Sequence, residues 1–248
     1  MTGIAGMMFA NRTPPAVSGG DTDPYWANVG LLMSARNGTI SDLSTNALTL
    51  TKIGTTSAVD VTSATAKFGT QSVRFTASGT GYGTGALSVG PSSAIDISTG
   101  NFTIEWWQNS FAAGNYMDPF GWGNWSIQAY VTSDAIAYEM DNNGGSPLLY
   151  STSFYSLSRN NWHHVAIVRE GNVFSFFTNG TRRTQTTQAI TISNVSGRKL
   201  AIGDNDANAT YGSSQTYNGY LDEFRITKGV ARYTGSTYTV PTARFPAG

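Results

Sequence analysis

The stretch WHHVAIVREGNVFSFFTNG, residues 162–180, decides the fold. Its first half, Trp162 to Arg169, has apolar residues on both faces of the expected strand, which is typical of a strand in the middle of a sheet. Gly171-Asn172 supplies turn residues, and 173–178 is a second run of β-branched and aromatic residues. Asn179-Gly180 is the strongest short hairpin signal in the chain. The stretch therefore predicts consecutive antiparallel strands, the first of them central in its sheet.

Short β-rich runs punctuated by turn residues extend in both directions from this stretch. No window holds three turns of helical apolar spacing. Strands that recur every ten residues or so, with glycine at 28 of 248 positions, are typical of a sandwich or a barrel. We therefore predict an all-β fold, in which 25–248 form one two-sheet antiparallel β-sandwich. The clearest runs are 48–51, 72–76, 102–107, 200–203 and 220–226.

Residues 1–24 differ from the rest of the chain. The sequences PP at 14–15 and SGG at 18–20 can continue neither helix nor strand, so we predict an extended N-terminal arm or linker. The arm carries apolar residues that have no core of their own, and we expect them to anchor the chain on a neighbouring subunit or a larger assembly. An unstructured tail would account for them equally well. These residues are Met7, Met8 and Phe9.

Composition excludes several classes of protein. The absence of cysteine rules out disulfides, thiolate metal sites and cysteine nucleophiles. A net charge of zero, with 12% charged residues, offers no field for nucleic acid. No apolar run approaches the roughly 18 residues of a membrane span, and the short run 4–10 lacks the basic flank of a signal peptide. We expect neither a nucleic-acid partner nor membrane insertion.

Several motifs occur in order along the chain: DPYWANVGLLM at 23–33, KFGTQSVRF at 67–75, GNFTIEWW at 100–107, NWHHVAIVR at 161–169 and NGYLDEFRITKGVARY at 218–233. Together they resemble the laminin-G-like branch of the concanavalin A-like lectin/glucanase superfamily. The closing run resembles the version found in bacteriophage virion proteins. The resemblance implies a jelly roll of two curved antiparallel sheets, with glycans bound on the concave face or its rim loops.

The resemblance to phage proteins also implies a setting. The chain would fold in the host cytoplasm without a signal peptide and reach the virion surface, where the arm would attach it to other virion proteins. Sheet edges in a protein of zero net charge favour a covering partner, and phage appendages are commonly oligomeric, so we expect a homo-oligomer.

Carboxylates are the first candidates for catalysis in this superfamily. Its glycosidases use a Glu-x-Asp-x-x-Glu run, because retaining hydrolysis needs two carboxyl groups about 5–5.5 Å apart. This chain has no such run. Glu105 has no acidic neighbour, and Asp222 and Glu223 are adjacent and expected on opposite faces. Glu139 and Asp141 have the i, i+2 spacing, but they lie beside the turn sequence 142–145, where an acidic side chain is usually only solvated. We therefore predict no catalytic residues and no enzymatic activity.

Calcium is the one candidate ion, and no cofactor is required. His163 and His164, the only histidines, face opposite ways on a strand and cannot share a metal. Relatives of the resembled family often hold calcium on rim loops with Asp, Asn and backbone carbonyls. A loop after the strand 200–203 fits best and the loop 141–143 second, although side chains that bond their own turn explain both. The preferred calcium residues are Asp204, Asn205 and Asp206.

Glycan binding would use aromatic platforms beside polar groups. If Phe102, Ile104 and Trp106 face the core, Glu105 and Trp107 share the opposite face, which the resemblance would make the concave one. The segment 116–130 adds further aromatic residues among Gly and Asn. Burial in the core is the competing interpretation for all of them. The remaining glycan candidates are Trp122, Trp125 and Tyr130. We expect Asp222, in phase with Phe224 and Ile226, to point inward as a structural acceptor.

The leading hypothesis is a non-catalytic phage virion surface protein, in a tail fibre, an appendage or on the capsid, that adheres to host-surface glycan. The alternative is a structural decoration or cement protein without glycan binding. A glycoside hydrolase is disfavoured because the carboxylate pair is missing.

Overall fold

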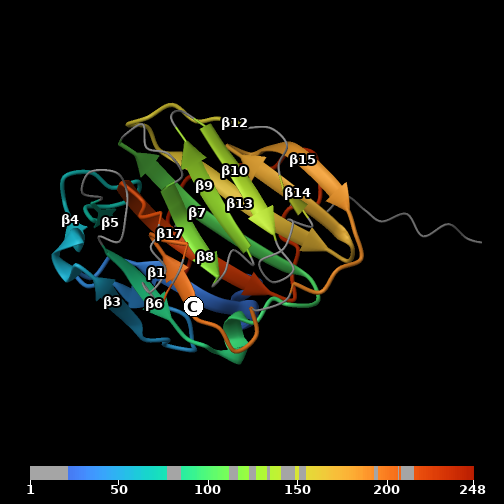
Figure 1. Ribbon diagram of the computed structural model, residues 1–248, viewed down its shortest axis with the longest axis horizontal. Coiled ribbons are helices and arrows are strands. Elements are labelled where there is room, and N and C mark those ends of the chain that lie inside the picture. The colour runs from blue at the N-terminus through green and yellow to red at the C-terminus, as the bar shows by residue number, and fades with distance from the viewer. Residues whose placement is uncertain are drawn as a thin grey trace, which may run out of the picture.

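A computed structural model describes residues 22–76, 85–111, 117–122, 127–132, 135–140, 149–150, 155–192, 195–205, 207 and 215–248. In these ranges the chain is an antiparallel two-sheet sandwich, so the predicted all-β, concanavalin A-like jelly roll is confirmed. Figure 1 shows strands β8, β9 and β10 of one sheet lying across β7, β13 and β17 of the other.

The first sheet has the order β15-β14-β13-β7-β17-β1-β2, with β5 also paired to β17 and β4 paired to β5. The decisive stretch supplies β13 and β14, and β13 pairs with β7 on its other side, as a central strand must. The strands are β1 Val29–Ser34, β2 Ser41–Asp42, β4 Val59–Thr62, β5 Ser72–Phe75, β7 Phe102–Ser110, β13 His163–Glu170, β14 Val173–Thr178, β15 Thr181–Thr187 and β17 Gly219–Lys228.

The second sheet has the order β11-β10-β9-β8-β16-β6-β3, with β12 also paired to β10. Its strands are β3 Leu50–Gly54, β6 Gly85–Val89, β8 Met117–Trp122, β9 Ile127–Thr132, β10 Ala135–Met140, β11 Leu149–Tyr150, β12 Tyr155–Ser156 and β16 Leu200–Ile202. The helical turns in the described ranges are short 3-10 helices: η1 Trp26–Asn28, η2 Thr56–Ala58 and η3 Ser93–Ile95.

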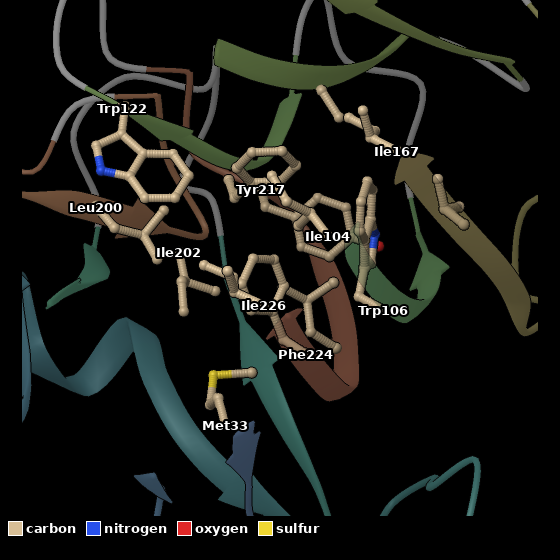
Figure 2. Close-up of a cluster of buried hydrophobic side chains, with 14 of the residues drawn as sticks. Met33, Ile104, Trp106, Trp122, Ile167, Leu200, Ile202, Tyr217, Phe224 and Ile226 are labelled. Carbon is tan, nitrogen blue, oxygen red and sulfur yellow. The ribbon is translucent and has the colours of Figure 1, made fainter. Parts of the chain in front are cut away.

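The main core fills the space between the two sheets. Trp106 of β7 packs edge-to-face on Phe120 of β8, with ring centroids 5.2 Å apart, and both rings are fully buried. Figure 2 shows apolar side chains of both sheets gathered in this cluster, with Trp106 and Phe224 from the first sheet and Trp122 and Leu200 from the second. Burial of such aromatic side chains is the largest favourable contribution to a fold of this kind.

A second layer covers the outer face of the first sheet. The C-terminal segment 229–248 crosses this face, where the Tyr238 amide donates to the Gly180 carbonyl at 2.8 Å. Two smaller apolar clusters form beneath it, one around Phe177 and Tyr233 and one around Trp107 and Phe245. The part of the outer face beneath this segment is therefore covered by the chain itself.

Strand β17 contains a bulge at Asp222 and Glu223, where the pairing with β7 shifts and Glu223 has a φ of 52°. Leu221 and Phe224, on either side, both face the main core. The expected alternation is therefore wrong here: Asp222 points away from Phe224, and the two carboxylates share the outer face because the bulge adds one residue. Asp222 is nevertheless the expected structural acceptor, since it accepts hydrogen bonds from the backbone amides of Lys67 and Phe68.

Among the described residues, no helix has the length and apolar character needed to cross a membrane.

Candidate functional site

Glu105 lies on the outer face of β7, opposite the main-core side chains, as alternation predicted. It is fully buried rather than available to a ligand. Arg225 donates to its Oε1 from Nε at 3.0 Å and from Nη2 at 2.7 Å, and the Tyr233 hydroxyl donates to its Oε2 at 2.6 Å. Burial alone would raise the pKa of Glu105, but Arg225, the neighbouring His164 ring and Arg232 lower it well below its usual range. The Glu105 carboxylate is therefore part of a buried network of hydrogen bonds and ion pairs with Arg225 and Tyr233.

Asp23 completes this network from outside the sheet. Its carboxylate accepts from Arg225 Nη1 at 2.8 Å and from Arg232 Nη2 at 2.8 Å. His164 contributes a ring whose Nε2 lies 3.3 Å from Glu105 Oε2. Burial, as the largest effect, lowers the pKa of His164. The buried arginines thus neutralise the buried carboxylates beneath the C-terminal segment.

Trp107 is 3% exposed, so it is not available as a glycan platform, and burial, the competing interpretation, is the correct one for it. Phe68 packs on its ring edge-to-face at 5.6 Å, and Lys67 Nζ lies 4.0 Å from the ring centroid. Phe245 belongs to the same cluster. The residue is covered because two segments distant in sequence fold over this part of the sheet, which alternation along β7 does not reveal.

Trp122 is also buried, because it lies on the inner face of β8 and packs in the main core. Core burial, the competing interpretation, is therefore the correct one for this residue. Tyr130 belongs to β9, and its side chain lies outside the described residues. Trp125 lies outside the described residues altogether.

The preferred calcium loop is described in part. Asp204 and Asn205 are 4% and 1% exposed, and Asp204 Oδ2 accepts from the Thr216 hydroxyl at 2.9 Å. In the described ranges, no three His, Cys, Asp or Glu side chains gather closely enough to hold a metal by themselves. Outside those ranges lie the second candidate loop, 141–143, and the residues Asp206, Met7, Met8 and Phe9.

Three aromatic residues that carry no sequence motif of their own lie together at one end of the outer face; we call them the aromatic patch. They are Phe111 after β7, Trp162 before β13 and Tyr220 in β17, and all three are partly exposed. Phe111 and Tyr220 meet edge-to-face with centroids 4.4 Å apart, and Trp162 and Tyr220 lie 6.4 Å apart. The patch forms because β13, β7 and β17 are neighbours in the sheet, so one end of each strand lies beside the ends of the others.

Polar groups border the aromatic patch. Arg74 of β5 is exposed and sits opposite Tyr220 in the antiparallel register. Trp162 Nε1 donates to Thr65 Oγ1 at 3.4 Å, which orients the indole ring. A guanidinium beside exposed ring faces can bind hydroxyl groups while the rings contact apolar surface. Spacing along the chain gives no sign of this arrangement, since the residues come from four segments.

A groove of ≈ 390 Å³ lies at the edge of the second sheet. Hydroxyl side chains and one amine line it together with an apolar wall, so it offers hydrogen-bonding groups to a small polar ligand. The lining residues are Leu48, Thr49, Thr51, Ile53, Ser88, Gly90, Pro91 and Lys199.

Solved structures similar to this chain include binding domains of toxins. The binding domain of Paraclostridial Mosquitocidal Protein 1 aligns with a TM-score of 0.60 at 16% identity, over 86% of this chain and 51% of that one. A structure of botulinum neurotoxin type C, which depends on interaction with two ganglioside molecules to enter cells, aligns with a TM-score of 0.61 at 15% identity, over 85% and 50%. The chain thus spans about half the length of these structures.

A third structure matches over nearly its whole length. Domain 4 of an extracellular arabinanase from Geobacillus stearothermophilus, in complex with arabinotriose, aligns with a TM-score of 0.61 at 15% identity, over 82% of this chain and 94% of that one. These likenesses show the fold. No curated protein sequence matches this chain.

The family is shown by sequence. Residues 78–232, more than half of the chain, match the family described as Concanavalin A-like lectin/glucanases superfamily, of the Laminin_G_3 type. The match covers the strands from β6 to β17, which build most of both sheets. This chain therefore belongs to the concanavalin A-like lectin/glucanase superfamily.

Proposed function

We propose that this domain is a non-catalytic module that binds glycan through the aromatic patch. The observation that carries the proposal is the meeting of three partly exposed rings, Phe111, Trp162 and Tyr220, beside the exposed Arg74. Exposed aromatic clusters mark contact surfaces, and a ring face next to a hydrogen-bond donor suits the alternating apolar and hydroxyl surface of a sugar.

The similar structures support this proposal. One was solved with arabinotriose, and another belongs to a toxin that depends on gangliosides. The burial of Glu105 supports a non-catalytic role, because its carboxylate is bound by Arg225 and Tyr233 and its lowered pKa makes it a poor proton donor.

We further propose that the domain is displayed on the surface of a bacteriophage virion, in a tail fibre, in an appendage or on the capsid. Residues 1–24, with Met7, Met8 and Phe9, would attach the domain to other virion proteins. Sugar contacts on a shallow surface are individually weak, so display of many copies, as in a homo-oligomer, would raise the overall affinity for a host surface. The support for this setting is the resemblance of the closing sequence 218–246 to phage virion proteins.

The experiment is binding of the full-length protein to an array of bacterial glycans, followed by titration with the best glycan. Trp162→Ala should lower the affinity by at least about tenfold, the equivalent of roughly 1.4 kcal/mol. Trp26→Ala is the matched control, because Trp26 is another partly exposed tryptophan. It lies just before β1, whose Val29 pairs with Thr227, seven residues along β17 from Tyr220. Lys199→Ala tests the groove of the second sheet in the same assay. Near-ultraviolet circular dichroism verifies that each variant is folded.

Two results would overturn the proposal. If no glycan on a broad array binds, the function fails, and loss of virion attachment upon deletion of 1–21 would then favour a structural decoration protein. If a glycan binds and Lys199→Ala abolishes binding while Trp162→Ala does not, the aromatic patch is the wrong surface.

A further inference from the structure

Asn109 of β7 has a side-chain oxygen that is buried without a partner. The residue is 6% exposed, and its Oδ1 receives no hydrogen bond. An amide oxygen in this state has lost its hydrogen bonds to water and has gained none from the protein, which costs free energy. Such exceptions are rare in folded proteins, so this unpartnered acceptor indicates a role outside the hydrogen bonding of the fold itself.

Asn109 lies in the middle of the aromatic patch. The next residue, Ser110, bonds to Tyr217 of the main core with 3.0 Å between the two hydroxyl oxygens, so Asn109 is on the opposite, outer face of the sheet. Tyr220 is its partner in the antiparallel register with β17. Trp162 immediately precedes β13, whose register with β7 places it beside Asn109 on the other side. The amide is therefore flanked by two aromatic residues of the patch.

The flanking rings can give a ligand access to Asn109. Both Trp162 and Tyr220 are partly exposed, and their ring centroids lie 6.4 Å apart. Exposed side chains change rotamer rapidly, and such changes are common when a ligand binds. Movement of either ring uncovers Oδ1 at the base of the patch. A hydroxyl or N–H group of a sugar that contacts the rings can then donate to Oδ1 and supply the missing hydrogen bond.

Arg74 extends the same row of side chains beyond Tyr220. It is exposed and pairs with Tyr220 in the register of β5 and β17, and its two neighbours along β5 belong to the main core, so it shares the outer face with the patch. In the part of the chain that the structure describes, no carboxylate forms an ion pair with Arg74. Its cross-strand neighbour Asp60 lies 3.8 Å from Lys52 instead. The guanidinium is thus available to an external anion.

The positions of the guanidinium and the amide suit a single ligand. One strand, β17, separates β5 from β7, so Arg74 and Asn109 are two strand spacings of about 4.8 Å apart. Lys67 adds a second positive charge near the patch, because its Nζ lies 4.0 Å from the ring centroid of Trp107, two residues before Asn109 on the same face of β7. A guanidinium binds a carboxylate or a phosphate through paired hydrogen bonds that a neutral sugar cannot match.

We propose that the aromatic patch selects an acidic sugar, whose hydroxyl or N–H group donates to Asn109 Oδ1 and whose carboxylate or phosphate pairs with Arg74. This inference rests on the proposed glycan binding and names the class of sugar that the patch takes. The rings contact the apolar surface of the sugar, Asn109 selects a donor group, and Arg74 selects the charge. Asn109 therefore pays for its burial in the free protein and regains a hydrogen bond when the sugar binds.

The test compares matched pairs of glycans in titrations with the full-length protein. One pair consists of oligosaccharides that contain glucuronic acid and the same oligosaccharides after reduction of the carboxylate to an alcohol. The other consists of phosphorylated mannose oligosaccharides and their dephosphorylated forms. The wild type should bind the acidic member of at least one pair about tenfold more tightly than the neutral member, because charge-assisted hydrogen bonds are the stronger ones. The pair that shows the preference identifies the anion.

Arg74→Gln should remove this preference and leave binding of the neutral member as it was. Arg198→Gln is the matched control, because Arg198 is also exposed but lies just before β16 in the second sheet, and it should keep the preference.

Asn109→Ala should weaken binding of both members of a pair at least about tenfold. Its Tm should equal or exceed that of the wild type, because the substitution removes an acceptor that the protein does not satisfy. Asn109→Leu, which keeps the volume of the side chain, is the second variant if Asn109→Ala does not fold. Asn205→Ala is the matched control, since Asn205 is 1% exposed and has an unpartnered Nδ2 but follows β16 of the second sheet, so glycan binding should be unchanged.

The outcomes separate this inference from the proposed function. If glycans bind and Trp162→Ala weakens them, but neither pair shows a preference for its acidic member, the inference alone is overturned. It is also overturned if Arg74→Gln keeps the preference. A lower Tm for Asn109→Ala with unchanged glycan affinity would make the amide purely structural and would overturn it as well. If no glycan of any kind binds, the inference and the proposed function both fail.

Discussion

Asp222 shows how a single position can couple this fold to pH. Burial is the largest cause that raises its pKa, to about 7, and the neighbouring Glu223 adds to the effect. The backbone amides of Phe68 and Lys67, which donate to its Oδ2, oppose the rise but do not cancel it. The folded state therefore binds a proton at pH values where the unfolded chain has lost it.

Because the folded protein loses this proton as pH increases, its free energy of unfolding falls. The folded pKa is above the unfolded value, so the stabilising effect is complete below about pH 4 and is lost as pH rises to about 7. Each pH unit in that window costs up to about 1.4 kcal/mol, or roughly 4 kcal/mol in all. We predict that Asp222→Asn is less sensitive to pH than the wild type between pH 4.5 and 7.5 and is the more stable of the two at pH 7.5.

Urea unfolding at several pH values measures this difference. Glu170→Gln is the control, because Glu170 is exposed at the end of β13 and its substitution should leave the pH profile unchanged. Parallel profiles for the wild type and Asp222→Asn would contradict the prediction.

At single positions, the sequence predicted the chemistry of side chains better than their surroundings. Alternation correctly placed Glu105 and Trp107 on the face opposite Trp106. It could not show that Phe68 and Phe245, from segments far away in sequence, cover that face. It also failed at Asp222, because a bulge depends on a positive φ at a non-glycine residue, Glu223, which has no compositional signal.

At the scale of elements, the hairpins were the most predictable features. Asn179 and Gly180 have φ values of 49° and 78°, as a two-residue turn of the type favoured between twisted strands requires. This turn joins β14 to β15. Such local chemistry can be read from neighbouring residues, whereas the aromatic patch joins strands from distant parts of the chain.

The C-terminal segment is the element whose role the sequence did not reveal. Its residue Phe245 is 2% exposed and belongs to the cluster around Trp107. The centroid of the Phe245 ring lies 3.8 Å from the Arg225 guanidinium carbon. We predict that Phe245→Ala lowers the free energy of unfolding by about 3–5 kcal/mol, because it removes a buried ring and opens a cavity over the ionic network. Tryptophan emission should shift to longer wavelength as water reaches Trp107.

Guanidinium unfolding monitored by fluorescence tests this prediction. Thr242→Ala changes an exposed residue of the same segment and should behave as the wild type does. An unfolding free energy for Phe245→Ala within about 1 kcal/mol of the wild type would show that the segment contributes little.

For the whole molecule, Asp23 links the residues just before the predicted boundary to the sandwich. The sequence predicts a boundary between 24 and 25, and the buried carboxylate of Asp23 pairs with Arg225 and Arg232. We predict that a chain beginning at Thr22 keeps the wild-type Tm, whereas one beginning at Tyr25 is destabilised by several kcal/mol, because two buried guanidinium groups lose a shared partner.

Differential scanning calorimetry of the two truncated chains decides the point. Full-length Asp23→Asn separates the loss of charge from the loss of backbone and should reproduce most of the effect. Equal Tm values for both truncations would return the boundary to the position predicted from sequence.

The sequence predicted the overall architecture better than any other feature of the molecule, and it predicted binding surfaces least well. The order of the family motifs along 23–246 correctly predicted the jelly roll, because many local patterns agree with one topology. The aromatic patch arises only when strands distant in sequence become neighbours.

The ionic network also has a consequence for synthesis of the protein. Asp23 contacts Arg232, a separation of 209 residues, and Arg36 bonds to the Phe245 carbonyl across the same separation. During translation, Asp23 and Arg36 leave the ribosome long before these partners do. Contacts of such long range make folding slow, so the nascent chain keeps its outer sheet face uncovered until residue 245 has emerged. We therefore expect the sandwich to be completed only after the C-terminal segment has been synthesised.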